Sequence, residues 1–474
     1  MSPKKTDSRS ESYDQTGQRV ALTAAIMASF LTPFMVSSVN VALPVVGNEF
    51  SLNATALGWI ATAYLLAAAM VLMPAGKLAD IVGRKKLYLV GLGLYSGASF
   101  LCSFAVSSLS LILFRIFQGF GAGVMFATGL AIVTSVFPPE KRGMALGIVA
   151  GATYLGLSVG PVVGGLLTHY LGWQSIFWST APVGLIAFAL VLFGLKGEWA
   201  EARGESFDLA GSIVLAISLP AVVYGSSNLP SLMGILLLAV GFLGICAFFL
   251  IEARISSPIF PVTLLGNNRT FAFSCLAALI NYSSTFAVTF LLSLYLQHIQ
   301  GLPPQRAGTV LVAQPIVMAA VSPLAGKLSD RIEVRVLASI GMALVALGLA
   351  LLVFLDIQTR IPFVVVSLVV LGLGYGLFSS PNMNAIMSSV DKRLYGVASA
   401  TVGTVRLMGQ MLSMSIAVVI FTLVIGQVQI SPAVYRQLLR SIRIAFSVFS
   451  LLCFAGIFAS MVRGRLHSTR HQEA

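Results

Sequence analysis

Long apolar runs, interrupted only by short polar loops, restrict most strongly how this chain can fold. Stretches of about 20 apolar residues, enough for a helix to cross the hydrocarbon core of a bilayer, follow one another along most of the sequence. Hydrophobic residues make up 57% of the 474 residues and charged residues only 9%, whereas soluble domains average about a quarter charged residues. A soluble fold could not cover this apolar surface. The sequence therefore predicts an all-α, polytopic membrane protein.

Fourteen such runs are predicted, and they begin near residues 20, 54, 87, 109, 143, 174, 209, 231, 270, 308, 336, 361, 394 and 443. An even number of spans places both termini on one side of the membrane. Of the 29 lysines and arginines, 22 fall on that side, five on the other side and two inside spans. By the positive-inside rule, we expect the N- and C-termini in the cytoplasm.

The spans group into two sets of six, with two extra spans between them that have no counterpart in a simple duplication. We expect a disordered cytoplasmic tail over 1–19, a six-helix bundle over 20–195, and a linker with two additional spans over 196–269. A second six-helix bundle is expected over 270–463, followed by a cytoplasmic tail over 464–474. The outer stretch from Ser431 to Arg443 predicts an amphipathic interfacial helix leading into the last span.

A short charged turn occurs twice, each time after an apolar run. The first copy reads Gly76-Lys-Leu-Ala-Asp80 and the second, 250 residues later, Gly326-Lys-Leu-Ser-Asp330. Duplication explains this repeat best. Asp80 can pair with Arg84 four residues on, so we predict a conformational latch made of Gly76, Asp80, Gly83, Arg84, Asp330 and Arg331. Gly76 is expected to let the joined helices approach closely. Glu333 at the place of Gly83 predicts a second latch that is weaker or differently paired.

Two further motifs lie inside spans. Span four places Arg115 and Gln118 about one helical turn apart. Span five has glycines every four residues on one face and a proline that interrupts the backbone hydrogen bonds, so it is expected to pack closely and to bend. We assign helix packing and gating to Gly156, Gly160, Pro161, Gly164 and Gly165.

Together these three motifs resemble motifs A, B and C of the major facilitator superfamily, in order and on the matching spans. Four shorter strings narrow the resemblance to its fourteen-span drug:proton antiporter family, over residues 20–465: Asn40-Val-Ala-Leu-Pro44, Gly172-Trp173-Gln-Ser-Ile-Phe177, Tyr295-Leu-Gln297 and Arg406-Leu-Met-Gly409. The resemblance implies two six-helix bundles around a central cavity, two extra helices outside the transport path, and a place in the plasma (inner) membrane. It also implies secondary active transport by alternating access, with export of amphipathic, drug-like compounds driven by the proton gradient.

One position departs from that family. Its members usually carry an aspartate in span one where this chain has Met35, and all sixteen acidic residues here lie in loops, tails or span ends. Arginines keep their proton at physiological pH, so His169 and His298, both near span ends, are the remaining titratable candidates for coupling. A second hypothesis therefore stays open: a facilitator or importer of a specific small metabolite, such as an anion, without conventional proton coupling.

Polar residues inside spans are costly in a bilayer and are therefore candidates for the transport cavity. We predict a substrate cavity formed by Met35, Ser38, Asn40, Arg115, Gln118, Asn281, Tyr282, Gln314, Asn384 and Arg406. Side-chain amides, hydroxyls and backbone carbonyls could compensate the two arginines, and so could an anionic ligand. Both hypotheses remain open from the sequence.

Several classes of function are disfavoured. The four histidines and four cysteines have no metal-ligand spacing, no paired acids or nucleophile suggest an enzyme, and no phosphate-binding loop suggests ATP as the energy source. The basic residues lie in short clusters between apolar runs, which disfavours nucleic-acid binding. We expect no metal and no cofactor. The expected partners are a small-molecule substrate, protons and the lipid bilayer, and the expected state is a monomer.

Overall fold

The computed structural model describes residues 15–255, 258–260, 262–329, 331–390, 395–426 and 428–463, and nearly all of them are helical. Between residues far apart in the described sequence, the single β-type contact is an isolated bridge that joins Asn53 and Gln429. Thirteen of the described helices are long and apolar enough to cross a membrane. The predicted all-α, polytopic architecture is thus confirmed.

The first half contains the helices α1 (Gln15–Glu49), α2 (Ala54–Val82), α3 (Arg84–Cys102), α4 (Ser108–Val136), α5 (Pro139–Leu171) and α6 (Gln174–Ala189), the last extended by the π-helical turn Leu190–Gly194. Two helices follow, α7 (Leu209–Ser227) and α8 (Leu232–Glu252), and then the short α9 (Val262–Asn267). The second half contains α10 (Arg269–Thr285), α11 (Ala287–Leu294) with the π-helical turn Tyr295–Ile299, α12 (Pro304–Leu311), α13 (Ala313–Leu328), α14 (Val334–Val353), α15 (Ile361–Ser388), α16 (Tyr395–Val424) and α17 (Tyr435–Val462).

The count of fourteen spans depends on α3. This helix has 19 residues, enough to cross the hydrocarbon core, but it is not among the thirteen apolar helices because it begins with Arg84-Lys85-Lys86. It packs against α4 and α6 as the other helices of its half pack against one another. Fourteen spans therefore remain a prediction.

Two predicted boundaries differ from the structure. The first helix begins at Gln15, so residues 15–19 of the expected tail are helical, while residues 1–14 and 464–474 lie outside the described residues. The last helix begins at Tyr435 rather than near residue 443, after a 3₁₀ turn over Pro432–Val434. The amphipathic stretch therefore continues into α17 without a break, because nothing in it interrupts the helical backbone after Pro432.

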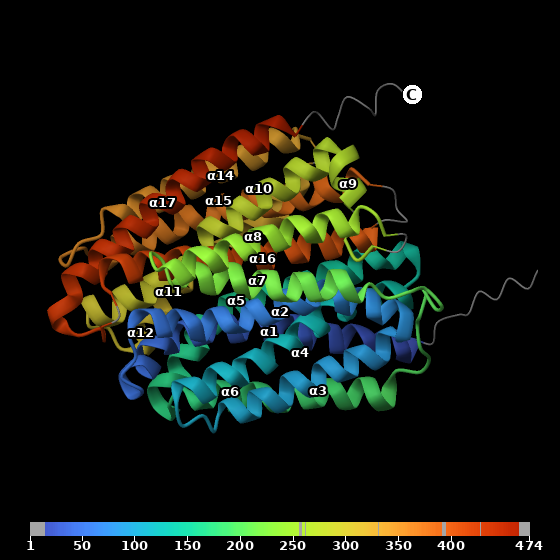
Figure 1. Ribbon diagram of the computed structural model, residues 1–474, viewed down its shortest axis with the longest axis horizontal. Helices are drawn as coiled ribbons and strands as arrows, with labels where there is room; N and C mark the ends of the chain where they lie inside the picture. The colour runs from blue at the N-terminus through green and yellow to red at the C-terminus, as the bar shows by residue number, and fades with distance from the viewer. Residues whose placement is uncertain are drawn as a thin grey trace, which may run out of the picture.

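The helices pack first within each half of the chain (Figure 1). In the first half α1 packs on α5, α2 on α4, and α3 on α4 and α6; in the second half α10 packs on α16, α13 on α15, and α14 on α15 and α17. The pair α7 and α8 pack on each other, and α7 also contacts α2 and α16. The two halves meet through α2 with α16, α5 with α12, and α1 with α11.

Among the described residues, contacts that join the two halves are found near one end of the molecule. We call the end where α1 begins and α17 ends the terminal face, on the right in Figure 1, and the other end the opposite face. Near the opposite face, Gln297 Nε2 donates to Val41 O at 2.8 Å and the hydroxyls of Thr55 and Thr422 lie 3.1 Å apart. Seven of the eight residues of α11 are buried there.

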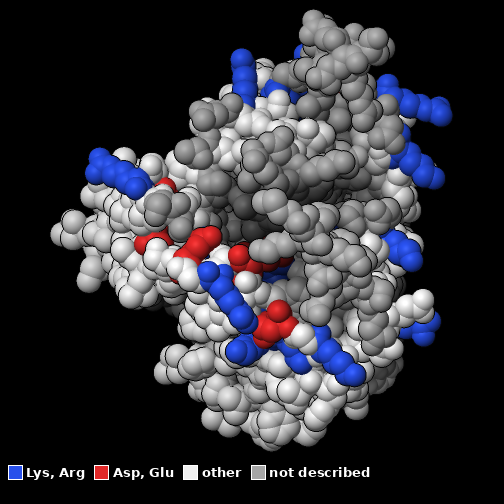
Figure 2. All heavy atoms as spheres, turned by 90° about the vertical axis from the view of Figure 1, so that its right-hand side faces the viewer, with Lys and Arg blue, Asp and Glu red and all other residues white. Residues whose placement is uncertain are grey.

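Towards the terminal face the packing is looser. Between Ala21 and Leu31 only one face of α1 is buried, whereas from Phe34 to Gly47 its buried residues cover almost the whole helix. Figure 2 views the terminal face, where acidic and basic side chains form a group in the lower half of the picture. Among the described residues, α1 is therefore packed more closely near the opposite face than near the terminal face.

Candidate functional site

Arg406 of α16 lies among aromatic side chains from both halves. Its guanidinium carbon is 4.5 Å from the ring centroid of Phe126 on α4. Tyr154 on α5 and Tyr375 on α15 lie close enough to interact with its charge. The ring of Tyr375 is 6.0 Å from that of Tyr282 on α10. We call these five residues the arginine–aromatic cluster.

The cluster has the properties of a ligand site. All five side chains are only half-buried, although they lie deep in the bundle, so they border open space between the halves. Arg406 Nε is buried and has no hydrogen-bond partner among the described residues. A guanidinium donates charge-assisted hydrogen bonds to acceptor oxygens, and aromatic rings stack on flat ligands. This arrangement can therefore bind an aromatic compound that carries a hydrogen-bond acceptor.

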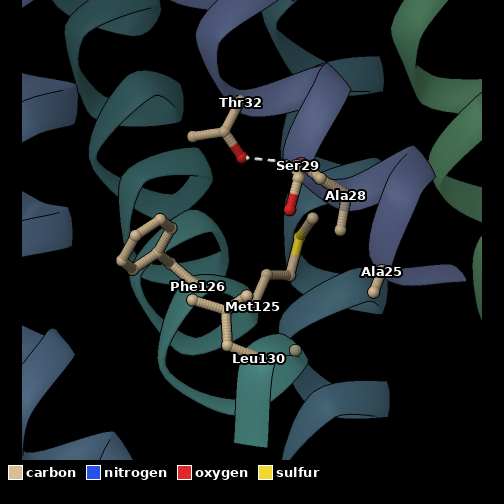
Figure 3. Close-up of a pocket in the computed structure, with 8 residues that line it drawn as sticks. Ala25, Ala28, Ser29, Thr32, Met125, Phe126 and Leu130 are labelled. Carbon is tan, nitrogen blue, oxygen red and sulfur yellow. Dashed lines mark hydrogen bonds between the residues drawn. The ribbon is translucent and has the colours of Figure 1, made fainter. Parts of the chain in front are cut away.

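A small hollow adjoins the cluster on the side of the terminal face (Figure 3). It lies between α1 and α4 and is lined by Ala25, Ala28, Ser29, Thr32, Met125, Phe126, Gly129 and Leu130. Its volume of about 10 Å³ holds roughly one water molecule. Phe126 thus lines the hollow and also contacts Arg406.

Arg115 has different surroundings. It is buried inside the first half, where Nη1 donates to Gln118 Oε1 at 2.6 Å and Nε donates to Ile60 O at 3.3 Å. Gln118 Nε2 in turn donates to Ser99 Oγ at 2.7 Å, and the guanidinium lies 4.2 Å from the ring centroid of Tyr64. Of the two hypotheses for this arginine, the structure shows compensation by protein groups, and Arg115 and Gln118 do not border the open space.

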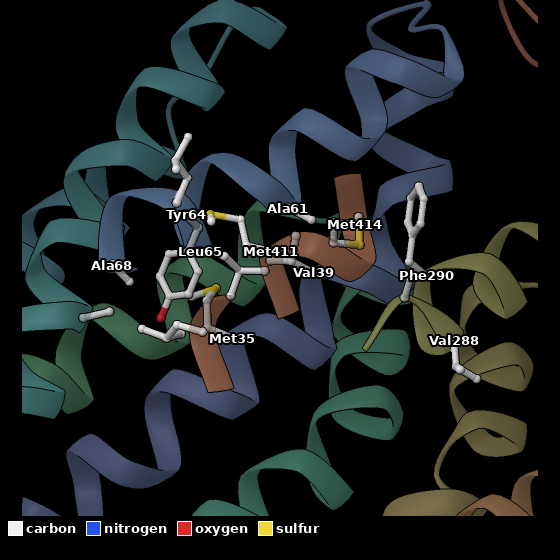
Figure 4. Close-up of a cluster of buried hydrophobic side chains, with 14 of the residues drawn as sticks. Met35, Val39, Ala61, Tyr64, Leu65, Ala68, Val288, Phe290, Met411 and Met414 are labelled. Atoms are coloured by element: carbon white, nitrogen blue, oxygen red, sulfur yellow. The ribbon is translucent and has the colours of Figure 1, made fainter. Parts of the chain in front are cut away.

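Met35 lies at the junction of three helices (Figure 4). It is fully buried on α1, beside Tyr64 and Leu65 of α2 and Met411 of α16. All of these neighbours belong to one continuous hydrophobic core. The position at which the resemblance leads us to expect an aspartate is therefore occupied here by a packed apolar side chain.

The other predicted cavity residues lie at different depths. Asn281 is fully buried and neither its side-chain nitrogen nor its oxygen has a partner among the described residues, and the same holds for Asn40 Oδ1. Ser38 Oγ donates to Gly160 O at 2.9 Å and thus binds α1 to α5. Gln314 is half-buried on α13, and Asn384 is exposed and donates to Ser329 Oγ at 2.9 Å. Of the predicted set, the structure brings only Tyr282 and Arg406 into the cluster.

The glycines of α5 serve two contacts. On one face, a Cβ on Gly156 would lie 2.5 Å from Phe30 O and one on Gly164 would lie 2.6 Å from Ser38 Cα, so these glycines permit the close approach of α1. Gly160 faces Ser37 in the same contact. On the other face, a Cβ on Gly165 would lie 2.6 Å from Pro304 O of α12, in the second half.

The first latch contains the predicted ion pair and, in addition, two carboxylates from the linker after α6. Arg84 Nε donates to Asp80 Oδ1 at 2.7 Å, as the spacing predicts. Its Nη1 and Nη2 each donate to one oxygen of Glu201 at 3.0 Å, so the linker after α6 supplies a bidentate carboxylate. Glu198 accepts from the backbone N–H groups of Lys85 at 2.8 Å and Lys86 at 3.2 Å.

Two glycines of this latch have distinct surroundings. Gly83 has φ +132°, which favours glycine, and a Cβ there would collide with the carboxylate of Glu198. A Cβ on Gly76, in contrast, would meet only Ala127 at 4.0 Å. The close approach that we expected at Gly76 is therefore not made there, because a Cβ at this position would have room. Asp330 of the second latch lies outside the described residues, and Arg331 is exposed.

Sequence reasoning missed the linker carboxylates and three of the aromatic residues. Glu198, Glu201 and Glu205 are spaced three and four residues apart in a chain with few charges, and this spacing was the available signal. For Phe126, Tyr154 and Tyr375 the sequence carries no such signal, because aromatic residues inside spans are common in any apolar helix.

Comparisons with known proteins agree with this architecture. The profile of the Major Facilitator Superfamily matches residues 25–414 and 274–473. The riboflavin transporter RibZ of Clostridioides difficile (strain 630) is 31% identical to the chain over 395 residues, which cover 82% of the chain and 84% of RibZ. The multidrug resistance protein Stp of Mycobacterium tuberculosis (strain CDC 1551 / Oshkosh) is 30% identical over 405 residues, which cover 84% of the chain and 75% of Stp.

Solved structures show the same fold. A POT family transporter in complex with a thioalcohol-conjugated peptide superposes with a TM-score of 0.70 at 16% identity, covering 93% of this chain and 95% of that one. The human organic anion transporter MFSD10 superposes with a TM-score of 0.62 at 15% identity, covering 94% and 99%.

Proposed function

The chain belongs to the Major Facilitator Superfamily. From this premise we propose that it is a secondary carrier that exports amphipathic aromatic compounds across the plasma membrane, driven by the proton gradient. One observation carries the proposal: a half-buried arginine with an unpaired donor lies among aromatic rings contributed by both halves. A ligand bound there touches both halves at once. Its binding energy can therefore favour one arrangement of the halves over the other.

For an exporter, substrate would enter the arginine–aromatic cluster from the more loosely packed terminal face. The distribution of lysine and arginine supports a cytoplasmic position for that face. The glycine contact of α5 with α12, where a Cβ on Gly165 would lie 2.6 Å from Pro304 O, is a surface on which the halves would rock. The similarity to a protein named as a multidrug resistance protein supports a drug-like substrate.

The experiment is uptake of a fluorescent aromatic anion and of a fluorescent aromatic cation into proteoliposomes. We expect saturable transport and counterflow, and we expect Arg406→Gln to abolish transport of the anion while its expression and unfolding temperature stay unchanged. The matched control is Arg360→Gln, which removes an arginine near the opposite face, outside the cluster. Unchanged transport by R406Q would contradict the assignment of this site.

A second candidate is a carrier of one specific metabolite without conventional proton coupling. It is favoured by the buried Met35 and by the similarity to a protein named as a riboflavin transporter. Among the described residues, no carboxylate lies in the arginine–aromatic cluster. Recording the pH inside the vesicles during transport separates the two candidates: a proton antiporter changes the lumenal pH when substrate moves, and an uncoupled carrier does not.

A further inference from the structure

A groove of about 520 Å³ opens on the outer surface between α14 and α17, near the terminal face. Its wall is apolar: Val336, Ile340 and Ala343 of α14 face Ile457 and Met461 of α17. Val336, Ile340 and Met461 are exposed. In a membrane this wall is in contact with acyl chains, at the level where α14 begins and α17 ends.

Positive charge gathers at the mouth of this groove. Arg335, in the first turn of α14, lines the groove and is half-buried, and none of the ion pairs formed by the described residues involves it. Behind the groove, Ser339 Oγ donates to Ser460 Oγ at 3.0 Å, and Ser460 is also bonded to the guanidinium of Arg463.

Arg463 adds a second cation to this end of the groove. It is 1% exposed, and its Nη1 donates to Asn382 Oδ1 at 2.8 Å. Burial lowers the pKa of Arg463 to about 10, so the group is still charged at neutral pH. Within the described part of the chain, its hydrogen-bond partners are neutral. Neither Arg335 nor Arg463 takes part in any of the ion pairs among the described residues.

The internal duplication allows the surroundings of Arg335 to be compared with those of the matching residue in the first half. Aligning Gly326 with Gly76 places Arg335 opposite Lys85 of α3, and α17 opposite α6. Lys85 Nζ donates to Leu195 O at 2.5 Å and to Leu192 O at 3.5 Å. In the first half, backbone oxygens at the end of α6 and its π-helical turn therefore accept the hydrogen bonds of this cation. Arg335 has no such oxygens from the described residues, and it faces a lipid-side groove instead.

We propose that this groove binds one phospholipid with an anionic headgroup. The headgroup phosphate accepts hydrogen bonds from Arg335, and an acyl chain lies along the wall formed by Val336, Ile340 and Met461. Arginine binds phosphate oxygens in a bidentate geometry, and basic pockets between spanning helices suit anionic lipid headgroups. In the second half, the phosphate oxygens of the lipid would thus accept hydrogen bonds from Arg335, as the backbone oxygens at the end of α6 do from Lys85 in the first half.

The test uses the full chain purified in a neutral detergent. Native mass spectrometry counts the phosphatidylglycerol molecules retained, with phosphatidylcholine of the same acyl chains for comparison. We expect wild type to retain one phosphatidylglycerol, and Arg335→Gln to bind it about tenfold more weakly or worse. Arg19→Gln is the matched control, because Arg19 is an exposed arginine near the start of α1 on the same face. Equal retention by wild type, R335Q and R19Q would overturn the proposal.

Two further measurements distinguish the contribution of the lipid headgroup from that of its acyl chains. Ala343→Trp narrows the groove without changing its charge, and we expect it to weaken phosphatidylglycerol binding as well. Glycerol phosphate carries the headgroup charge without acyl chains, and we expect no competition at a concentration equal to that of the lipid. Full competition by glycerol phosphate, or wild-type binding by A343W, would show that the groove is not the site.

Discussion

The two arginines inside the spans have opposite surroundings. Arg115 is buried and uses Gln118, a backbone carbonyl and the ring of Tyr64 as partners. Arg406 is half-buried and keeps a donor unpaired. The same substitution should therefore change the stability of the protein at one position and its transport at the other.

Arg115→Gln should lower the stability of the folded protein. The change removes the donors to Gln118 Oε1 and Ile60 O and leaves both acceptors buried, and each lost bond to a charged group costs about 1.5–3 kcal/mol. We expect R115Q to unfold at a lower temperature than wild type in detergent, with R406Q unfolding at the wild-type temperature. If R115Q is as stable as wild type, the network does not stabilise the fold.

At the scale of single helices, the glycines of α5 provide an internal comparison. Gly164→Ala would place a Cβ 2.6 Å from Ser38 Cα, so α1 and α5 would have to separate, and overpacking of this kind costs about 1–3 kcal/mol. Gly151 lies on the same helix and has nothing within 4 Å of its Cβ position. We expect G164A to lower the unfolding temperature and G151A to leave it unchanged or raise it. Equal shifts in the two variants would contradict tight packing at Gly164.

The linker after α6 acts as a further element of the latch. Arg84 and Glu201 form a bidentate pair in which the arginine is 10% exposed, whereas Lys77 and Glu205 form a single contact. A double-mutant cycle of R84Q with E201Q, measured by unfolding in SDS, should give a coupling of about 1 kcal/mol. The cycle of K77Q with E205Q should give a smaller value. A larger coupling for the lysine pair would show that the linker does not hold Arg84.

The sequence predicts elements better than it predicts contacts between them. Most helix starts fall within a few residues of the predicted positions, because apolar runs, capping residues such as Asn53 and the turn at Gly83 define them locally. The pair of Asp80 with Arg84 was also predictable, since it depends only on a spacing of four residues. Glu201 reaches Arg84 across 117 residues, and no local rule connects such positions. Likewise, only packing of five helices shows that Arg406 meets aromatic rings of both halves.

For the whole molecule, the seal at the opposite face is the feature that alternating access must break. It includes the polar contacts of Gln297 with Val41 O and of Thr55 with Thr422, the close backbone approach of Gly165 to Pro304, and the buried apolar side chains of α11. Separation of the halves at this face would break both the polar and the apolar contacts. A covalent link across the seal should therefore stop transport without harming the fold.

The double variant Thr55→Cys, Thr422→Cys tests whether a covalent link across the seal stops transport. Because the two hydroxyl oxygens lie 3.1 Å apart, we expect a disulfide to form on mild oxidation, to abolish transport, and to be reversed by a reductant. The native cysteines Cys102, Cys275 and Cys453 are buried, so Cys246 is the one to replace by serine first. Each single cysteine variant should transport with or without oxidant. Full transport by the cross-linked protein would mean that the halves do not separate at this face, because a linked seal cannot open and the substrate would have no exit there.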